Sequence, residues 1–187
     1  MQVTPLDIPD VKLIQPKKFG DARGFFMETY SQPRLAEAGV NVDFVQDNHS
    51  LSADVGVLRG LHFQKPPHAQ AKLVRVTAGR VYDVAVDIRK GSPTYGKWVG
   101  CELTPAGEQL FVPAGFLHGF VTLESNTEFL YKVSSLYAPD SDAGVIWNDP
   151  TLSIPWPIQG KPMLSGKDAQ LPTLAEFDSP FVYEAAP

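Results

Sequence analysis

Short runs of β-branched and other apolar residues, separated by glycine, proline, asparagine or aspartate, recur along the chain as far as Val133. The clearest pair is Leu73–Thr77 and Val81–Ile88, two β-branched runs around Ala-Gly-Arg, a spacing typical of a β-hairpin. Seven or eight short strands in all predict an all-β sandwich or barrel. The further strands are expected at residues 43–45, 55–63, 97–103, 109–112, 119–123 and 128–133.

One helix is expected to interrupt this pattern. Ser31 is a candidate N-cap, Pro33 suits the first turn, and Gly39 is a candidate end. From Tyr137 onward the apolar runs give way to a proline-rich segment. We interpret it as an ordered C-terminal wrap with one short helix near residues 174–177. The length predicts a single domain, residues 1–187.

Composition narrows the class of protein. The formal net charge of -5 argues against nucleic-acid binding, because surfaces that bind phosphate backbones usually carry a basic excess. The single Cys101 cannot form an intramolecular disulfide, and the first residues lack the features of a signal peptide, so we expect a cytoplasmic protein. The longest uncharged stretch, residues 109–123, is too short and too interrupted to span a bilayer, so we expect no membrane association.

A histidine follows a Pro-Ala-Gly turn at the end of one predicted strand. The spacing Gly107-x5-Pro113-x-Gly115-x2-His118 resembles the second motif of the cupin superfamily, and the segment around His62 occupies the place of the first. This resemblance implies a double-stranded β-helix, or jelly-roll barrel. The two histidines would then lie in the barrel interior.

The residues after His62 do not suit a metal site. Metal-binding cupins have His-x-His and a glutamate in the first motif, whereas here Phe63 and Gln64 follow His62, and Gln70 stands where an acid is needed. Most catalytic metal sites have at least three protein ligands. We therefore expect no metal.

A longer, ordered series of segments resembles the dTDP-4-dehydrorhamnose 3,5-epimerase family across residues 5–170. The resemblance implies a cofactor-free homodimer that converts dTDP-4-dehydro-6-deoxy-D-glucose to dTDP-4-dehydro-L-rhamnose in dTDP-L-rhamnose biosynthesis. The matching segments are residues 19–28, 44–50, 57–64, 70–76, 81–93, 113–120, 131–132, 147–150 and 164–168.

This chemistry needs groups on two faces of the sugar. Removal of a proton beside a ketone requires a base, a cation or donor at the carbonyl oxygen, and an acid on the opposite face for inversion. His62 is a natural base, because an imidazole pKa of about 6.5 lies near neutral pH. The resemblance implies Asp168 as the partner of His62, Lys72 as the cation near the sugar O4, and Tyr131 as the proton donor.

The resemblance also implies a set of substrate contacts. A nucleotide diphosphate carries about two negative charges, which guanidinium and ammonium groups hold well. Arg23 and Glu28 are candidates for reaching the neighbouring subunit's site, and Phe19, Phe26 or Tyr137 for stacking on thymine. The implied substrate-binding residues are Arg23, Glu28, Gln46, Asp47, Asn48, Arg59, His118, Tyr137, Asp142 and Lys167.

Simpler roles exist for several of these residues. Without the motifs, His62 would more often be a core histidine, and Lys72 and Tyr131 ordinary strand residues. Asp83 shares a strand face with Asp87, which indicates either a solvent-facing position or, in a polar barrel interior, a contact near Lys72.

Three positions depart from the family pattern. Ala71 stands where many members have glycine, Gly166 where glutamate is common, and Asp142 where glutamate is usual, which shortens that side chain by one methylene. Other functions also stay open. A sugar-binding cupin without activity, an epimerase for one carbon only, or a ketoisomerase on a dTDP-4-keto sugar would share the same pocket.

Overall fold

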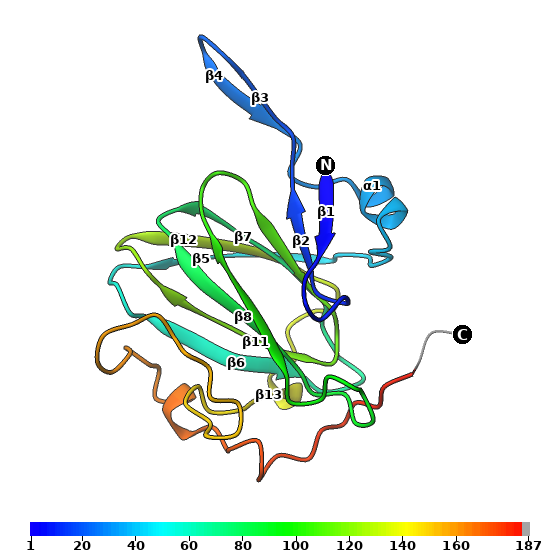
Figure 1. The fold of residues 1–187 in the computed structure, drawn as a ribbon, viewed down its shortest axis with the longest axis vertical. Helices are drawn as coiled ribbons and strands as arrows, with labels where there is room; N and C mark the ends of the chain where they lie inside the picture. Colours follow the sequence, from blue (N-terminus) through cyan, green and yellow to red (C-terminus); the bar gives the residue numbers. More distant parts are fainter. Residues whose placement is uncertain (185–187) are drawn as a thin grey trace.

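The computed structural model describes residues 1–184, and most of its strands belong to two antiparallel sheets (Figure 1). The strands of these sheets are β1 (Gln2–Pro5), β2 (Lys12–Gln15), β5 (Gln46–Ser52), β6 (Leu58–Gln64), β7 (Lys72–Ala78), β8 (Val81–Asp87), β9 (Trp98–Leu103), β10 (Gln109–Val112), β11 (Phe116–Thr122), β12 (Thr127–Val133) and β13 (Asp142–Gly144). One sheet has the order β1-β2-β10-β7-β12-β5 and the other β13-β6-β11-β8-β9. The predicted all-β jelly roll of cupin type is confirmed.

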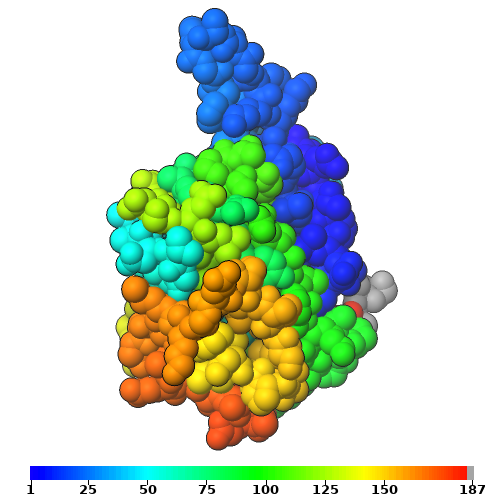
Figure 2. All heavy atoms as spheres, turned by 60° about the vertical axis from the view of Figure 1, so that its left-hand side comes forward, coloured from blue at the N-terminus to red at the C-terminus, as the bar shows by residue number. Residues whose placement is uncertain are grey.

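A third, two-stranded sheet stands apart from this body. It consists of β3 (Lys18–Asp21) and β4 (Gly24–Met27), which pair with each other. Both Figure 1 and Figure 2 show this hairpin projecting from one end of the molecule, while the C-terminal segment covers the opposite end. We call this hairpin the β3–β4 arm.

The buried apolar residues form three layers. Between the two sheets, Val74 and Phe129 of one sheet pack against Ala85 and Phe120 of the other, and the Phe120 and Phe129 rings stack at 4.0 Å. The outer face of the five-stranded sheet is covered by the C-terminal wrap, through residues such as Trp156. The outer face of the six-stranded sheet is covered by α1 (Gln32–Glu37) and its flanking segments.

The strand pairing differs from the expected hairpin. Leu73–Thr77 and Val81–Ile88 do form β7 and β8, but β7 pairs with β10 and β12 whereas β8 pairs with β9 and β11. The hairpin prediction was therefore wrong. Gly79, with φ 73°, turns the chain from one sheet to the other, and a Cβ there would collide with Thr127.

The strand expected at residues 43–45 is also absent from that position. The strand begins after that position, as β5, and its polar side chains alternate between the interior and the exterior. Because the interior of this barrel is partly polar, β5 lacks the apolar run that predicted the other strands. The remaining expected strands agree with β6, β9, β10, β11 and β12 except at their ends.

The predicted helix is confirmed as α1, although its start differs in detail. Ser31 is the N-cap residue, as predicted, but its side chain makes no capping hydrogen bond. Gly39 ends the helix at φ 75°. The helix expected near residues 174–177 is only a turn. The short helical turns of the C-terminal half are instead the 3-10 segments η1 (Pro139–Ser141) and η2 (Asp168–Gln170).

The C-terminal wrap is anchored by a buried carboxylate. Asp149 is 1% exposed; its Oδ1 accepts hydrogen bonds from the N–H groups of Thr151 and Leu152, both at 2.9 Å, and its Oδ2 from that of Leu174 at 2.7 Å. One side chain thus fixes two separate turns of the wrap. Across residues 1–184, no helix reaches the length and apolarity required for a membrane span.

We predict that Asp149→Ala lowers the free energy of unfolding by about 2–4 kcal/mol, because several buried N–H groups lose their acceptor. Urea denaturation measures the change. Asp54→Ala, at an exposed carboxylate, is the control and should change stability by less than about 0.5 kcal/mol. An equally small effect of Asp149→Ala would show that the wrap does not depend on this contact.

Candidate active site

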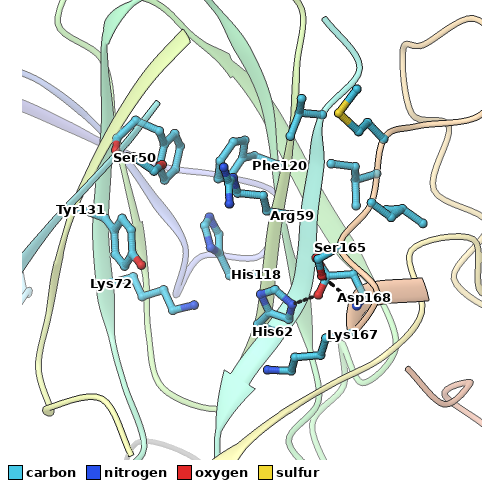
Figure 3. Close-up of a pocket in the computed structure, with 15 residues that line it drawn as sticks. Ser50, Arg59, His62, Lys72, His118, Phe120, Tyr131, Ser165, Lys167 and Asp168 are labelled. Atoms are coloured by element: carbon cyan, nitrogen blue, oxygen red, sulfur yellow. Dashed lines mark hydrogen bonds and ion pairs between the residues drawn. The ribbon is translucent and has the colours of Figure 1, made fainter. Parts of the chain in front are cut away.

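A cavity of about 470 Å³ lies inside the barrel, between the two sheets and the C-terminal wrap (Figure 3). Apolar side chains form part of its wall, including Phe120 and Phe129 from facing sheets and Leu164 from the wrap. Its polar lining is Ser50, Arg59, His62, Lys72, His118, Tyr131, Ser165, Lys167 and Asp168. Volumes of this order suit a small organic ligand.

His62 and Asp168 form a close pair at one side of the cavity. The His62 Nε2 lies 2.6 Å from Asp168 Oδ1, and the two residues come from β6 and from the start of η2 (Figure 3). The Asp168 carboxylate also receives the N–H of Gly60 at 3.4 Å, and the Asp168 N–H donates to Ser165 Oγ at 3.0 Å. Asp168 is therefore held in a fixed position relative to β6.

This pairing sets the chemistry of His62. Burial alone would raise the pKa of Asp168, but the contacts with His62 and the Gly60 N–H outweigh it and lower the pKa. The carboxylate is therefore ionised, and the imidazole donates Nε2–H to it. That tautomer leaves Nδ1 as the nitrogen that can accept a proton.

Lys72 and Tyr131 lie on the opposite side of the cavity from His62 (Figure 3). They come from the paired strands β7 and β12, where Tyr131 is opposite Val74 and Val133 is opposite Lys72. Both side chains therefore face the same side of the sheet. Burial raises the pKa of Tyr131, which keeps its hydroxyl protonated and able to donate.

The Lys72 ammonium is poised to meet a ligand. Burial lowers its pKa to about 8, and Asp83 and Asp142 oppose that effect. Within residues 1–184 no side chain or carbonyl hydrogen-bonds to this ammonium, although it lines the cavity. An oxygen atom of a bound ligand would supply the missing partner.

A second buried pair, Asp83 and His118, lies deeper in the wall. The His118 Nε2 is 2.9 Å and 3.0 Å from the two carboxylate oxygens of Asp83, which is 0% exposed. His118 is opposite His62 in the pairing of β11 with β6. The solvent-facing alternative for Asp83 is wrong, because this face of β8 points into the barrel. In residues 1–184, no three His, Cys, Asp or Glu side chains are grouped as a possible metal site.

Comparison of the sequence with known proteins shows which family this chain resembles. The sequence model of the family described as dTDP-4-dehydrorhamnose 3,5-epimerase matches residues 5–176. The enzyme of that name from Pseudomonas aeruginosa is 54% identical over 180 residues, which are 95% of this chain and 98% of the relative. The chain belongs to the dTDP-4-dehydrorhamnose 3,5-epimerase family.

Solved structures agree with membership of this epimerase family. The dTDP-6-deoxy-D-glucose-3,5-epimerase of Legionella pneumophila, in complex with dTDP-4-keto-L-rhamnose, has a TM-score of 0.94 at 44% identity and covers 98% of this chain and 99% of its own. The 3'-monoepimerase ChmJ of Streptomyces bikiniensis, in complex with dTDP-quinovose, has a TM-score of 0.85 at 34% identity, with 91% and 87% covered. The 3,5-epimerase and the 3'-monoepimerase therefore share one fold.

Several substrate contacts implied by the epimerase family lie in or beside the cavity. Arg59 and Lys167 line it. Asp142 pairs with Lys167 and accepts a hydrogen bond from the Tyr137 hydroxyl at 3.2 Å, so its shorter side chain still reaches both neighbours. Tyr137 lies beyond the end of β12, because that strand stops at Val133, and so it does not share a strand face with Tyr131.

The polar run at the start of β5 divides between two faces. Gln46 and Asn48 share one face and are hydrogen-bonded to each other at 2.8 Å, and Gln46 also accepts the N–H of Tyr137. Asp47 points to the other face, where it pairs with Lys132 at 2.7 Å. Asp47 therefore lies outside this cavity of its own chain, because successive strand residues alternate in direction.

Arg23 and Glu28 lie outside the cavity of their own chain. Arg23 belongs to the turn of the β3–β4 arm and pairs with Asp21, and Glu28 follows the arm and pairs with Arg34. Residues missed by sequence reasoning include Ser50, Ser165 and the aromatic pair of the wall. For Ser50 a signal existed, because alternation along β5 places it on the same face as Asn48.

Proposed function

We propose that this protein epimerises dTDP-4-dehydro-6-deoxy-D-glucose at C3 and C5, giving dTDP-4-dehydro-L-rhamnose for dTDP-L-rhamnose biosynthesis. One observation carries the proposal: a paired histidine and a tyrosine face each other across one cavity, with a buried ammonium on the tyrosine side. The family and the ligand of the Legionella structure support the substrate class.

The chain supplies each group that the reaction needs. Nδ1 of His62 removes the proton from the carbon next to the ketone, and the electron pair of that C–H bond moves onto the C4 oxygen. Lys72 donates a hydrogen bond to the resulting enolate and balances its charge. Tyr131 returns a proton to the opposite face. His62 then releases the abstracted proton to solvent, and Tyr131 takes a proton back from solvent. No metal or cofactor takes part in this scheme.

The nucleotide half of the substrate needs cations near the cavity mouth. Arg59 and Lys167 line the cavity, and we assign them to the diphosphate. Gln46 and Asn48 extend the same face of β5 and would meet polar groups of the nucleoside. His118 and Asp142 complete the proposed contacts with the substrate.

We also infer that the protein is a homodimer in which the arm of one subunit completes the site of the other. The β3–β4 arm is a two-stranded hairpin, which is marginally stable alone in water. Its Phe25 and Phe26 are 59% and 69% exposed. A second subunit would cover these rings and receive Arg23 and Glu28. A cytoplasmic location suits a protein with a single cysteine and a nucleotide-sugar substrate.

The second candidate function is inversion of a single carbon. The similarity to ChmJ favours it over the ketoisomerase and the inactive sugar-binding protein, because a monoepimerase shares this fold. Both epimerases need the same base and acid, and they differ in how the hexose is held.

Replacing His62 with asparagine should reduce turnover by about two to four orders of magnitude, the usual contribution of a general base. Asp168→Asn should act in the same direction, because it removes the charge that orients the imidazole. Steady-state kinetics and dTDP binding measure the effect, and dTDP affinity should change little. His49→Asn, at an exposed histidine on the outer face of β5, is the matched control. Near-normal turnover of His62→Asn would remove this residue from the mechanism.

Turnover in D2O should place deuterium at both C3 and C5, because the proton that returns to each carbon comes from solvent. Mass spectrometry and NMR of the product measure the incorporation. Tyr131→Phe keeps the ring but removes the acid, so exchange of the abstracted proton should continue while completed inversion falls. One deuteron supports the monoepimerase, and inverted product without solvent hydrogen contradicts an enolate mechanism.

Hybrid dimers test the exchange of arms. Arg23→Glu and His62→Asn subunits carrying different tags are co-expressed, and the mixed dimer is purified. If the arm acts in trans, one site of the hybrid has both an intact His62 and an intact Arg23. We expect about half of the wild-type activity per dimer, although each parent variant is nearly inactive. A hybrid as inactive as its parents, or a monomer by light scattering, rejects the proposed dimer.

A further inference from the structure

The chain after β12, residues 135–138, lies beside the cavity without helix or strand structure, and we call it the rim segment. Its two central side chains, Leu136 and Tyr137, are 63% and 59% exposed, so apolar packing contributes little to holding it. The Tyr137 hydroxyl nevertheless donates to Asp142, which pairs with Lys167 of the cavity lining. Polar contacts must therefore fix the backbone that carries this ring.

Gln64, near the end of β6, makes the main contacts with the rim segment. Its Nε2 donates to the carbonyl of Leu136 at 3.1 Å, and its Oε1 accepts the N–H of Ala138 at 2.8 Å. These two hydrogen bonds lie on either side of Tyr137. Nε2 also donates to the carbonyl of His68 at 2.8 Å, so both amide hydrogens and the oxygen are in use.

The other two side chains that bind the backbone of the rim segment are also glutamines. Gln70, just before β7, donates to the carbonyl of Ser135 at 2.7 Å, and Gln46 of β5 accepts the N–H of Tyr137 at 3.3 Å. Both are only partly buried, whereas Gln64 is 3% exposed. A buried polar contact costs more to lose than one that water can replace, so Gln64 contributes most to fixing the segment.

We propose that Gln64 is a positioning residue that fixes Tyr137 beside the cavity, so that a substrate meets a rim that is already ordered. Ordering a segment during binding lowers affinity, and order that exists beforehand avoids this loss. Among the described residues, Gln64 is not part of the cavity lining, so its effect on a ligand passes through Tyr137. That effect rests on the proposed function and on the substrate contact expected of Tyr137, whereas the order of the rim segment is a property of the protein alone.

Gln64→Met tests the order of the rim segment, because methionine is of similar size but makes none of these hydrogen bonds. In the wild-type protein, hydrogen exchange should show protected N–H groups at Tyr137 and Ala138. We expect exchange at both positions to be about tenfold faster in Gln64→Met, the scale of one lost hydrogen bond, with exchange in the middle of β12 unchanged. Unchanged exchange at Ala138 in the folded variant overturns the proposal.

Steady-state kinetics test the route through Tyr137. In Gln64→Met we expect KM to rise about tenfold and kcat to stay within about twofold of wild type, because a binding contact is lost equally in the ground and transition states. In a Tyr137→Ala background, Gln64→Met should change KM by less than about twofold, because the ring through which it acts is absent. An equal rise in KM with and without Tyr137 overturns this route, as does a fall in kcat at unchanged KM.

Thr127→Val is the matched control, because it also replaces a buried polar side chain by an apolar one of similar shape. Thr127 is 0% exposed at the opposite end of β12, where its hydroxyl donates to the carbonyl of Glu124 at 2.8 Å and accepts the N–H of Arg80 at 3.3 Å. The substitution should lower stability and leave both KM and the exchange at Ala138 in place; equal changes overturn the specific role of Gln64. If the protein proves inactive as an epimerase, the exchange measurements still decide whether Gln64 orders the rim segment.

Discussion

Carboxylates inside this barrel must be paired, because the interior offers little water to solvate a charge. The site is built from such pairs. His62 with Asp168 and His118 with Asp83 each join an imidazole to a carboxylate, at 2.6 Å and 2.9 Å respectively. The two pairs differ in their electrostatics: contacts lower the pKa of Asp168 in spite of its burial, whereas burial raises the pKa of Asp83.

The C-terminal wrap connects this electrostatic arrangement to the fold. It covers the outer face of the five-stranded sheet through Trp156 and Leu174, and it delivers Asp168 and Lys167 to the cavity. Asp149 holds two turns of the wrap together. Packing outside the sheet therefore determines the position of a group that acts inside the barrel. A loss of order in the wrap would separate Asp168 from His62.

The sequence predicted those parts of the fold that depend on apolar runs. β7 and β8 were located because both faces of these strands are covered. Their connection was predicted wrongly, because a hairpin and a corner between two sheets share the same local pattern around Gly79. The strand β5 was predicted too early in the chain, because its inward residues are polar and give no apolar run.

The site could be predicted only through the family resemblance. His62 and Asp168 are 106 residues apart, and no spacing rule brings them together. The position of Asp83 was undecided in the sequence, because an acidic residue within an apolar run fits either a solvent face or a polar interior. The structure decides this question, because Asp83 is fully buried and His118 of the neighbouring strand β11 is hydrogen-bonded to it. The β3–β4 arm was not predicted, because its exposed strands contribute no apolar core that would give a pattern in the sequence.

We propose that one cavity inverts two carbons of one sugar. Proton NMR of the product formed from dTDP-4-dehydro-6-deoxy-D-glucose tests it most directly, because the ring proton couplings report the configuration at C3 and C5. We expect dTDP-4-dehydro-L-rhamnose, with both centres inverted. A product inverted at one carbon only, or unchanged substrate, would contradict it.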